Sequence, residues 1–311
     1  MALNDSYPQH VVTAVIVAHD GAAWLPHVID ALLEQDRPVQ RVVAVDTGSR
    51  DRSGAVLAAK LGQAVVFGMD RGTGYGAAVS RALQHKAASV SVPAPAGPAG
   101  AERVEWVWLL HDDCEPAPDA LEQLLRGAAE SPAAGVLGPK VMDWSDRSVI
   151  VEAGVTIDAV GRRVTGIEPR EVDQGQHDGD RDVLAVGSAG MLIRRDVWDR
   201  TGGFDTGMAL FREDVDLCWR VHAAGYRVRL ITDAVVFHAQ AAARRRRPVS
   251  AGRRAPYLDR RNALMTLLGN LPFAAMLGSI ARNAATSFFR TLYLLLAKRP
   301  AAAGAGPARC L

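Results

Sequence analysis

Apolar and polar positions alternate in blocks along the first 130 residues of the chain. Short apolar runs that end in polar residues or glycine predict buried strands, and they lie within residues 11–21, 41–49, 64–70 and 104–110. Between these runs, apolar side chains recur with helical spacing, which predicts helices over residues 23–35, 53–62, 74–88 and 117–131. This alternation predicts an α/β fold, with a mostly parallel, Rossmann-like central sheet flanked by helices.

The second half of the chain has a less regular pattern. We expect short strands and polar turns across residues 136–186, then an apolar strand and a short helix across residues 185–204. In a parallel sheet, right-handed crossovers place the loops that follow the strands along one edge, where ligands bind. Polar residues at the ends of the predicted strands are therefore the first candidates for function.

Composition narrows the class of protein. The chain has 311 residues, of which 49% are hydrophobic and 23% are charged, a normal balance for a globular protein with a substantial core. The net charge of +2 gives no reason to expect a nucleic-acid partner. Three widely spaced cysteines without a CxxC pair argue against a disulfide framework or a zinc site and fit a reducing compartment. The polar N-terminus lacks the pattern of a signal peptide.

Local charge and composition suggest how the chain is organised. We assign residues 1–250 to one α/β domain, in which the Ala/Pro/Gly-rich residues 87–104 form a disordered inserted loop. Residues 244–247 are four consecutive arginines, and further arginine pairs follow before the sparsely charged residues 262–296. We therefore interpret residues 251–311 as a basic linker followed by apolar or amphipathic helices that associate with a membrane.

Polar side chains at the ends of strands could carry chemistry. The strand in "WVWLLHDDCEP" runs directly into His111, Asp112 and Asp113, and Mg²⁺ or Mn²⁺ often binds one or two carboxylates together with substrate phosphates. An acidic turn before the next helix would explain the same residues. Asp46 also ends a strand, where it could bind a nucleotide or form an ordinary Asx-turn. His238 ends another apolar run, where a histidine is more often structural than a ligand.

Two glycine-rich segments and one acidic segment are further candidates. "RGTGYGAA", which contains Gly74, and "GSAGMLI", which contains Gly190, allow a backbone to approach a ligand closely, although glycine spacing alone is weak evidence. "FREDVDLCWR" places three acidic residues in the first turn of a predicted helix, where the helix dipole favours them. The dipole accounts for Asp216, but it does not explain why Phe211 and the glycine-rich "GGFDTGM" precede the helix. The three carboxylates could also hold a catalytic base next to an acceptor hydroxyl.

Taken in order, these motifs resemble glycosyltransferase family 2, which has the GT-A fold, over residues 12–262. The most specific segment is "GGFDTGMALFREDVDLCWRVHAAGYRV", which is similar to the family's "GGFDE…F…EDVDLCWR…GY" signature. "AVIVAHDGAAWLPHVIDALLEQ" resembles the family's first strand and helix, and "VDTGSRDRS" resembles its "DNGSTDGS" loop. "RRNAL" resembles an Arg-Asn element of bacterial rhamnosyl- and galactofuranosyl-type cell-wall enzymes.

The resemblance implies a role for each motif. Asp214 would be the catalytic base, with Glu213 beside it in the acceptor site. His111 and Asp113 occupy the outer positions of the metal-binding DxD motif, and His238 would complete the shell around Mn²⁺ or Mg²⁺. To the nucleotide-sugar site we assign Val17, Ala18, Asp46, Gly74, Asp112 and Gly190.

Some positions depart from the family pattern. Asp20 stands where the family has an asparagine after the first strand, and Thr47 changes "DNGS" to "DTGS". Ser80 and Arg81 follow the "GTGYG" glycines where many members carry asparagine. His111 replaces the first DxD carboxylate, and a histidine ligand shifts the expected preference from Mg²⁺ towards Mn²⁺.

The resemblance implies an inverting, metal-dependent glycosyltransferase of cell-envelope synthesis. It would move a sugar from a nucleoside-diphosphate sugar to a hydroxyl of a glycan or polyprenyl-linked acceptor. A nucleotidyltransferase would need a basic nucleotide-gripping loop, which "AHDGAAW" is not. A catalytically inactive glycan- or nucleotide-sugar-binding domain of a larger membrane protein stays open as the alternative. His111 favours that alternative, whereas Asp113 and the Glu213–Asp214 pair count against it.

The C-terminal segment suggests a membrane surface. Residues 262–281 approach the length of a spanning helix, which needs about 20 apolar residues. Asn270, Pro272 and the nearby Arg282 interrupt this segment. We expect helices that lie on or re-enter the leaflet at the cytoplasmic face, with the arginines on anionic lipid. A transmembrane span and a hairpin that closes the globular domain are the alternatives.

Overall fold

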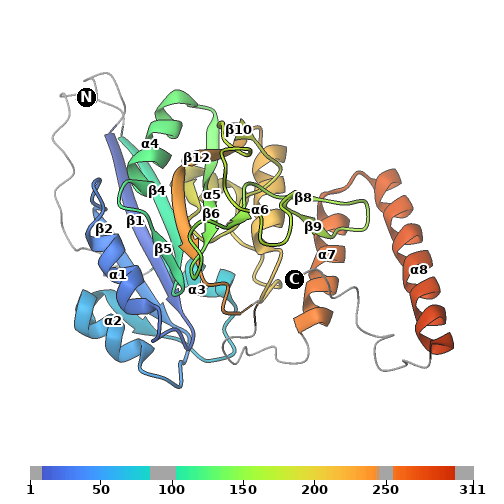
Figure 1. Cartoon of the computed structure of the whole chain (residues 1–311), viewed down its shortest axis with the longest axis horizontal. Coiled ribbons are helices and arrows are strands. Elements are labelled where there is room, and N and C mark those ends of the chain that lie inside the picture. Colours follow the sequence, from blue (N-terminus) through green and yellow to red (C-terminus); the bar gives the residue numbers. More distant parts are fainter. Residues whose placement is uncertain (1–8, 85–102, 243, 245–254, 298–311) are drawn as a thin grey trace.

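The computed structural model describes residues 9–84, 103–242, 244 and 255–297 of the chain. In this part of the chain, one large twisted sheet carries helices on both faces (Figure 1). The predicted α/β architecture with a mostly parallel sheet is therefore confirmed. The basic stretch at residues 245–254 lies outside the described residues, as do residues 87–102 of the expected inserted loop. The last two residues expected in that loop, 103 and 104, instead begin a strand.

Parallel strands form the N-terminal half of the sheet. The central strand β1 (Gln9–Ala18) lies between β2 (Arg41–Asp46) and β4 (Arg103–His111), and β3 (Val66–Gly68) follows β2 at the edge. All three pairings are parallel, so the carboxyl ends of these strands meet at one edge of the sheet. The expectation that the polar strand ends lie together holds for this half.

Antiparallel strands enter the C-terminal half. Strand β11 (Leu192–Arg194) runs antiparallel between β4 and β6 (Ala134–Asp143), and β12 (Arg227–His238) runs parallel beside β6. The short strands that pair antiparallel with these are β5 (Cys114–Pro116), β7 (Ile150–Glu152) and β10 (Arg181–Asp182). A separate hairpin consists of β8 (Thr156–Ile157) and β9 (Arg163–Val164).

Helices bury both faces of the sheet. One face is covered by α1 (Leu25–Leu33), α2 (Ser53–Leu61) and α4 (Ala120–Glu130). The opposite face is covered by α3 (Tyr75–Gln84), α5 (Arg195–Thr201) and α6 (Glu213–Ala223). A short 3₁₀ turn (Gln63–Val65) leads into β3. Because both faces are covered, the central strands read as continuous apolar runs, as is usual for parallel sheets.

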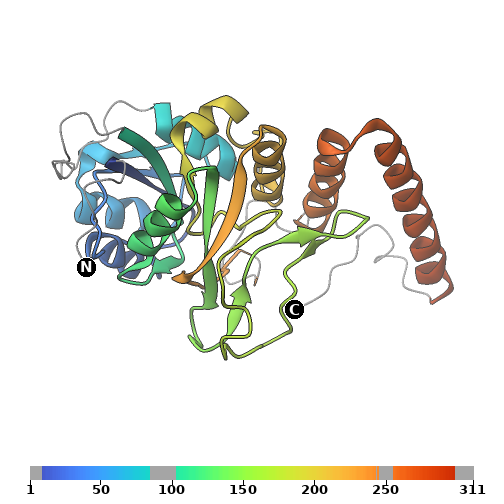
Figure 2. The same cartoon turned by 90° about the horizontal axis from the view of Figure 1, so that it is seen from above.

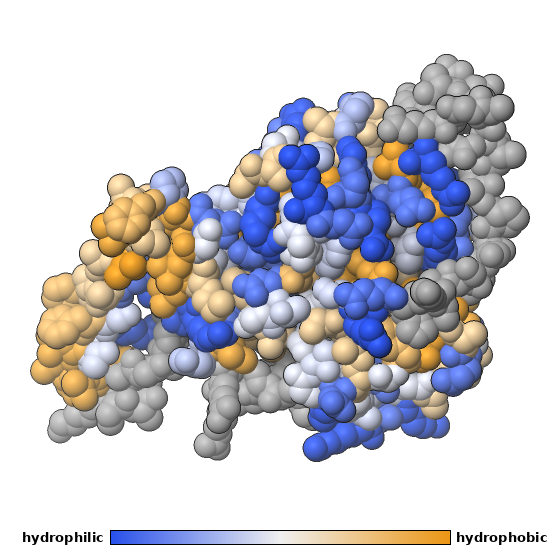
Figure 3. All heavy atoms as spheres, turned by 180° about the vertical axis from the view of Figure 1, so that it is seen from behind, coloured by the Kyte–Doolittle hydropathy of each residue, from blue (hydrophilic) through white to orange (hydrophobic). Residues whose placement is uncertain are grey.

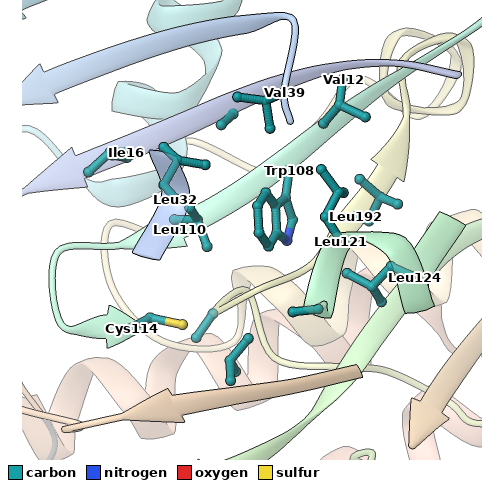
Figure 4. Packing of buried hydrophobic residues seen from close by; sticks show 14 of the residues in the cluster. Val12, Ile16, Leu32, Val39, Trp108, Leu110, Cys114, Leu121, Leu124 and Leu192 are labelled. Carbon is teal, nitrogen blue, oxygen red and sulfur yellow. The ribbon is translucent and has the colours of Figure 1, made fainter. Parts of the chain in front are cut away.

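Strand β1 shows how alternate side chains serve two cores. Val12 and Ile16 point to the α1 side, where they join Trp108 and Leu121 in one buried cluster (Figure 4). The intervening Val15 joins the second cluster, on the side of α3, α5 and α6. The strand is therefore fixed in register, because a shift by one residue would exchange the two sets of side chains.

Strand β6 is longer than the short strands expected in this region. All ten of its residues are buried, although Gly138, Pro139 and Lys140 interrupt the apolar pattern. A Cβ on Gly138 would lie 2.3 Å from Cβ of Val186, so the glycine permits close packing. The Lys140 ammonium is buried against Asp173, at 2.8 Å, and against a second aspartate of the same loop. The aspartates that pair with Lys140 lie in a loop far along the chain, so the sequence of the strand itself does not reveal the pairing.

Two helices follow the sheet at the C-terminal end. Helix α7 (Ala255–Asn270) contacts α6, and α8 (Phe273–Leu296) folds back beside α7 and stands away from the sheet (Figures 1 and 2). The break at residues 271 and 272 divides the apolar segment into two helices, and Pro272 is the N-cap residue of α8. None of the helices in the described residues is both long and apolar enough to cross a membrane.

Candidate active site

The ends of β4, β5 and β12 bring three potential metal ligands together. His111 is the last residue of β4, and His238 is the last residue of β12. Strand β5 pairs with β12 so that Cys114 lies opposite His238, which places the preceding Asp113 beside that histidine. One ligand atom from each of His111, Asp113 and His238 lies within 4.8 Å of the others. The sequence-based candidates for the metal therefore form one cluster.

Hydrogen bonds hold the carboxylate of this cluster in place. Asp113 is 1% exposed, and its Oδ2 accepts a hydrogen bond of 2.7 Å from the Ala241 amide. Its Oδ1 lies 3.2 Å from Nε2 of His238, and Nε2 of His111 lies 3.0 Å from Oγ of Ser188. Two imidazoles and a carboxylate suit a divalent transition ion such as Mn²⁺, so the residues fit the expected cation.

Asp112 is part of the framework that joins β4 to the loop after β1. Its Oδ2 accepts a hydrogen bond of 2.7 Å from the His19 amide, and the residue is 2% exposed. A Cβ on Gly21 would lie 2.2 Å from this same oxygen, so the loop approaches Asp112 as closely as only glycine allows. This packing fixes the position of the Asp112 carboxylate, and its contact with the donor stays a prediction.

The predicted nucleotide-binding positions lie on adjacent strand ends. Val17 and Ala18 are the register partners of Val45 and Asp46. Oδ1 of Asp46 accepts a hydrogen bond of 3.0 Å from the Ser49 amide, which is the Asx-turn that the sequence allowed. The carbonyl oxygen of Ala18 accepts hydrogen bonds from both the amide and the hydroxyl of Thr47, at 3.0 Å and 2.9 Å.

An ion pair that the sequence reasoning missed ties these loops together. Asp20 and Arg71, from the loops after β1 and β3, form a two-point hydrogen bond, and Arg71 also donates to the Gly48 carbonyl at 2.9 Å. The Arg71 guanidinium is the main reason that the pKa of Asp20 falls to about 2. The carboxylate in place of the family's asparagine therefore has a partner within the same site. No local motif connects residues that are so far apart in the sequence.

The two predicted glycines have packing reasons for their identity. A Cβ on Gly74 would lie 2.6 Å from Cα of Ala209, so the start of α3 lies directly against that loop. Gly190 has a φ of +88°, and its Cβ would lie 2.8 Å from Pro139. Gly74 therefore lies against the backbone of Ala209, and Gly190 lies against side chains of neighbouring strands. The role of these glycines in donor binding stays a prediction.

The acidic pair begins helix α6, as the sequence predicts. Glu213 and Asp214 are the first two residues of the helix, and both side chains are buried, with 7% and 6% of the residues exposed. Phe211 and Arg212, directly before the pair, have φ values of +67° and +74°. This left-handed turn is unusual for residues other than glycine, and backbone strain of this kind gathers at functional sites.

Arg163 holds the carboxylate of Asp214. Its guanidinium, on β9, donates to Oδ2 of Asp214 and to Oε2 of Glu152, both at 2.6 Å. Burial by itself would lower the pKa of Arg163, but the charges of Asp214 and Glu152 outweigh that effect and raise it. The second oxygen of Asp214 accepts the Val215 amide at 2.8 Å. Sequence reasoning missed Arg163 and Glu152 because they lie in an irregular region without a motif.

Glu213 has a different environment from its neighbour. Burial, and then the charge of Asp214, raise the pKa of Glu213 from its ordinary value to about 8. Its buried Oε2 makes no hydrogen bond within the described part of the chain. The raised pKa favours the protonated form of Glu213 near neutral pH, whereas Asp214 forms an ion pair with Arg163. Two carboxyl groups in such different environments are a common basis for a division of acid and base roles.

Tyr75 connects the acidic pair to the histidine cluster. Its ring packs edge-on against His111, with ring centroids 4.8 Å apart. Burial raises the pKa of Tyr75 well above its usual value, and nearby charges, of which Glu213 is the strongest, add to this effect. The phenol oxygen, like Oε2 of Glu213, is buried and makes no hydrogen bond within the described residues. Tyr75 is therefore a direct neighbour of His111 in the histidine cluster, and the charge of Glu213 influences its pKa.

Comparisons with known proteins agree with this arrangement. The family model described as "Glycosyltransferase like family 2" matches residues 8–254. An N-acetylglucosaminyl-diphospho-decaprenol L-rhamnosyltransferase of Mycobacterium tuberculosis is 27% identical over 77% of this chain and 80% of its own length. The galactofuranosyltransferase GlfT1 of Mycolicibacterium smegmatis is 24% identical, over 69% of this chain and 66% of its own length.

The fold also has counterparts among solved structures. The crystal structure of GalNAc-T7 with UDP, GalNAc and Mn²⁺ superposes with a TM-score of 0.55 at 17% sequence identity. The superposition covers 76% of this chain and 44% of that one, so the chain spans less than half of that protein. At this level of identity the similarity concerns the fold, which is the GT-A fold expected from the sequence.

Proposed function

The chain belongs to the glycosyltransferase-like family 2, and from this premise we propose that it transfers a sugar from a nucleoside-diphosphate sugar to an acceptor hydroxyl. The observation that carries the proposal is the cluster of His111, Asp113 and His238. Tyr75 packs against His111 in this cluster, and its pKa is raised in part by the charge of Glu213, the neighbour of Asp214. One group of residues suits a diphosphate-bound cation, and the other suits removal of a proton from a hydroxyl.

The reaction needs one base and one direct displacement. Asp214 accepts the proton of the acceptor hydroxyl while that oxygen attacks the anomeric carbon. The bond between this carbon and the diphosphate breaks, and the configuration at the carbon inverts. Glu213 is protonated near neutral pH, so it does not supply the second anionic carboxylate of a double-displacement mechanism. The O–H of the protonated Glu213 can instead donate a hydrogen bond to a hydroxyl of a bound sugar.

Other residues of the site would orient the base, hold the cation and bind the nucleotide. The two-point contact of Arg163 with Glu152 and Asp214 fixes the orientation of the base. Asp113 and the two histidines would hold a divalent cation, which would neutralise the charge of the departing diphosphate. Val17, Ala18 and Asp46 lie on neighbouring strand ends, where the nucleotide would bind.

The relatives and helix α8 support a proposal for the acceptor and for the location of the protein. The mycobacterial rhamnosyltransferase is named for a decaprenol-linked acceptor, and we assign this chain a lipid-linked or glycan acceptor of the cell envelope. Helix α8 exposes large apolar side chains, and its charged residues are two arginines, Arg282 and Arg290. These properties support docking on an anionic membrane surface at the cytoplasmic side.

A donor screen tests the proposal. The protein would be heated with UDP-glucose, UDP-N-acetylglucosamine, GDP-mannose or dTDP-rhamnose, in Mn²⁺ or in EDTA, and hydrolysis of each donor would be followed. We expect one nucleotide class to raise the melting temperature only with Mn²⁺, and its sugar to be released slowly. Asp113→Ala should remove the Mn²⁺-dependent shift. Stabilisation without any hydrolysis or transfer would instead identify an inactive binding domain, and no response to any donor would refute the proposal.

A further inference from the structure

Helix α7 contacts the turn that leads into the acidic pair. Asn262, in the first half of α7, is completely buried. Its Nδ2 donates hydrogen bonds to the carbonyl oxygens of Leu210 and Phe211, at 2.8 Å and 3.1 Å. One amide group thus satisfies two consecutive carbonyls directly before the helix that carries Asp214.

The turn needs this support because its backbone is strained. Phe211 and Arg212 have φ values of +67° and +74° in succession. Residues with a Cβ adopt this region only at a cost in free energy, so the conformation persists only where the surroundings hold it. Released from its partners, the turn would relax towards ordinary backbone angles and carry the start of α6 with it.

Two further contacts join α7 to the same place. Asp259 accepts a hydrogen bond of 2.7 Å from Nε of Arg212, which is the second residue of the strained turn. Asn270, at the other end of α7, donates to Oδ1 of Asp216 at 2.9 Å. Polar contacts from α7 therefore lie on both sides of Glu213 and Asp214 along the chain.

We propose that Asn262 is a positioning residue for the base Asp214, because its two hydrogen bonds hold the left-handed turn that sets the start of α6. This inference rests on the proposed function. It assigns a role in the reaction to α7, a helix whose residues lie beyond those matched by the family model. Asn262 itself acts only through the turn and needs no contact with the substrate.

The chemistry of the side chain explains why asparagine stands here. A primary amide supplies two N–H donors from one nitrogen, which is what two neighbouring carbonyl oxygens require. Leucine has a similar size but donates nothing. A displacement of about 1 Å at a reacting group can cost about 10²-fold in rate, so loss of the donors should act mainly on turnover.

The test compares two variants with a matched control in the same helix. Asn262→Ala removes both bulk and donors, whereas Asn262→Leu keeps the bulk and removes the donors. Thr266→Val is the control, because Thr266 is also buried, and among the described residues its hydroxyl bonds only to the Asn262 carbonyl inside α7, at 2.9 Å. Hydrolysis of the four nucleotide sugars with Mn²⁺ gives kcat and KM, and hydrogen exchange reports on residues 210–216.

We expect both Asn262 variants to lose about 10²-fold in kcat, with the donor KM nearly unchanged and faster exchange at residues 210–216. Thr266→Val should keep wild-type kcat and exchange. Wild-type kcat and wild-type exchange in Asn262→Leu would overturn the inference, because the residue would then serve only to fill space. If the wild-type protein hydrolyses none of the donors, the proposed function fails, and the exchange comparison still decides whether Asn262 holds the turn.

Discussion

At the scale of single residues, the ion pair between Asp214 and Arg163 gives the first prediction. Asp214→Asn keeps the size of the side chain but removes the base, and a positioned base contributes about 10²–10⁴-fold to a rate. We expect turnover to fall by about that factor while Mn²⁺-dependent donor binding, measured by calorimetry, is retained. Asp182→Asn is the control, because it alters another Arg–Asp pair at the sheet edge. Wild-type turnover in Asp214→Asn would remove Asp214 from the mechanism.

Glu213 gives a prediction about pH. Burial raises its pKa to about 8, so the folded protein keeps a proton that the unfolded chain releases above its ordinary pKa of 4.5. The unfolded state therefore binds fewer protons between these values, and this group makes the free energy of unfolding fall as pH rises from about 5 to about 8. We expect Glu213→Gln to flatten that decline, as measured by urea unfolding across this range. An unchanged slope would show that Glu213 is ionised in the folded protein.

The residues of the site differ in how far the sequence reveals them. The acidic pair and the histidine cluster stand in motifs or at strand ends, so their types and positions could be predicted from the sequence, and the structure brings the three cluster residues together. Arg163 and Tyr75 became visible only in the structure. Their partners are tens of residues away, and nothing local distinguishes a buried arginine that pairs with a base from an exposed one.

At the scale of elements, the strands and helices of the N-terminal half were predictable because both faces of a parallel sheet are covered. Each strand there is a continuous apolar run, and each helix has one apolar stripe. Strand β6 was harder to predict, because a glycine, a proline and a lysine break its pattern. The buried Lys140 of this strand pairs with Asp173 and Asp178, which lie more than 30 residues further along the chain. The periodicity of the strand cannot reveal such a contact.

The loop between β1 and α1 gives a prediction at this scale. In Gly21→Ala, the new Cβ would lie 2.2 Å from Oδ2 of Asp112, and that oxygen is also held by the His19 amide. Asp112 cannot move away from the new Cβ without losing its hydrogen bond from the His19 amide. We therefore expect a loss of about 1–3 kcal/mol in the free energy of unfolding. Gly72→Ala is the matched control, since a Cβ there meets nothing within 4 Å. Equal urea midpoints for the two variants would contradict this packing.

At the scale of the whole molecule, helix α8 presents a different surface from the α/β unit, which is the sheet with the helices that cover its faces. On the face seen in Figure 3, polar and apolar side chains are mixed over the α/β unit, whereas apolar side chains gather on the C-terminal helices. Phe288 and Phe289 are each 65% exposed, and Phe273 is 73% exposed. Exposed apolar surface that is contiguous on one helix is unusual for a protein that stays in water. No acidic residue lies in α8 to oppose an anionic surface.

The final prediction follows from this surface. We expect the protein to sediment with vesicles that contain phosphatidylglycerol, less with pure phosphatidylcholine, and less again as salt is raised, because the arginines of α8 add an electrostatic component. Burial of one phenylalanine contributes about 1.5–3 kcal/mol, so the double variant Phe288→Ser, Phe289→Ser should weaken binding at least about tenfold. Leu33→Ser, at a residue of α1 that is 50% exposed, controls for the general loss of surface hydrophobicity. If the double variant binds the vesicles like the wild type, α8 is not the docking surface.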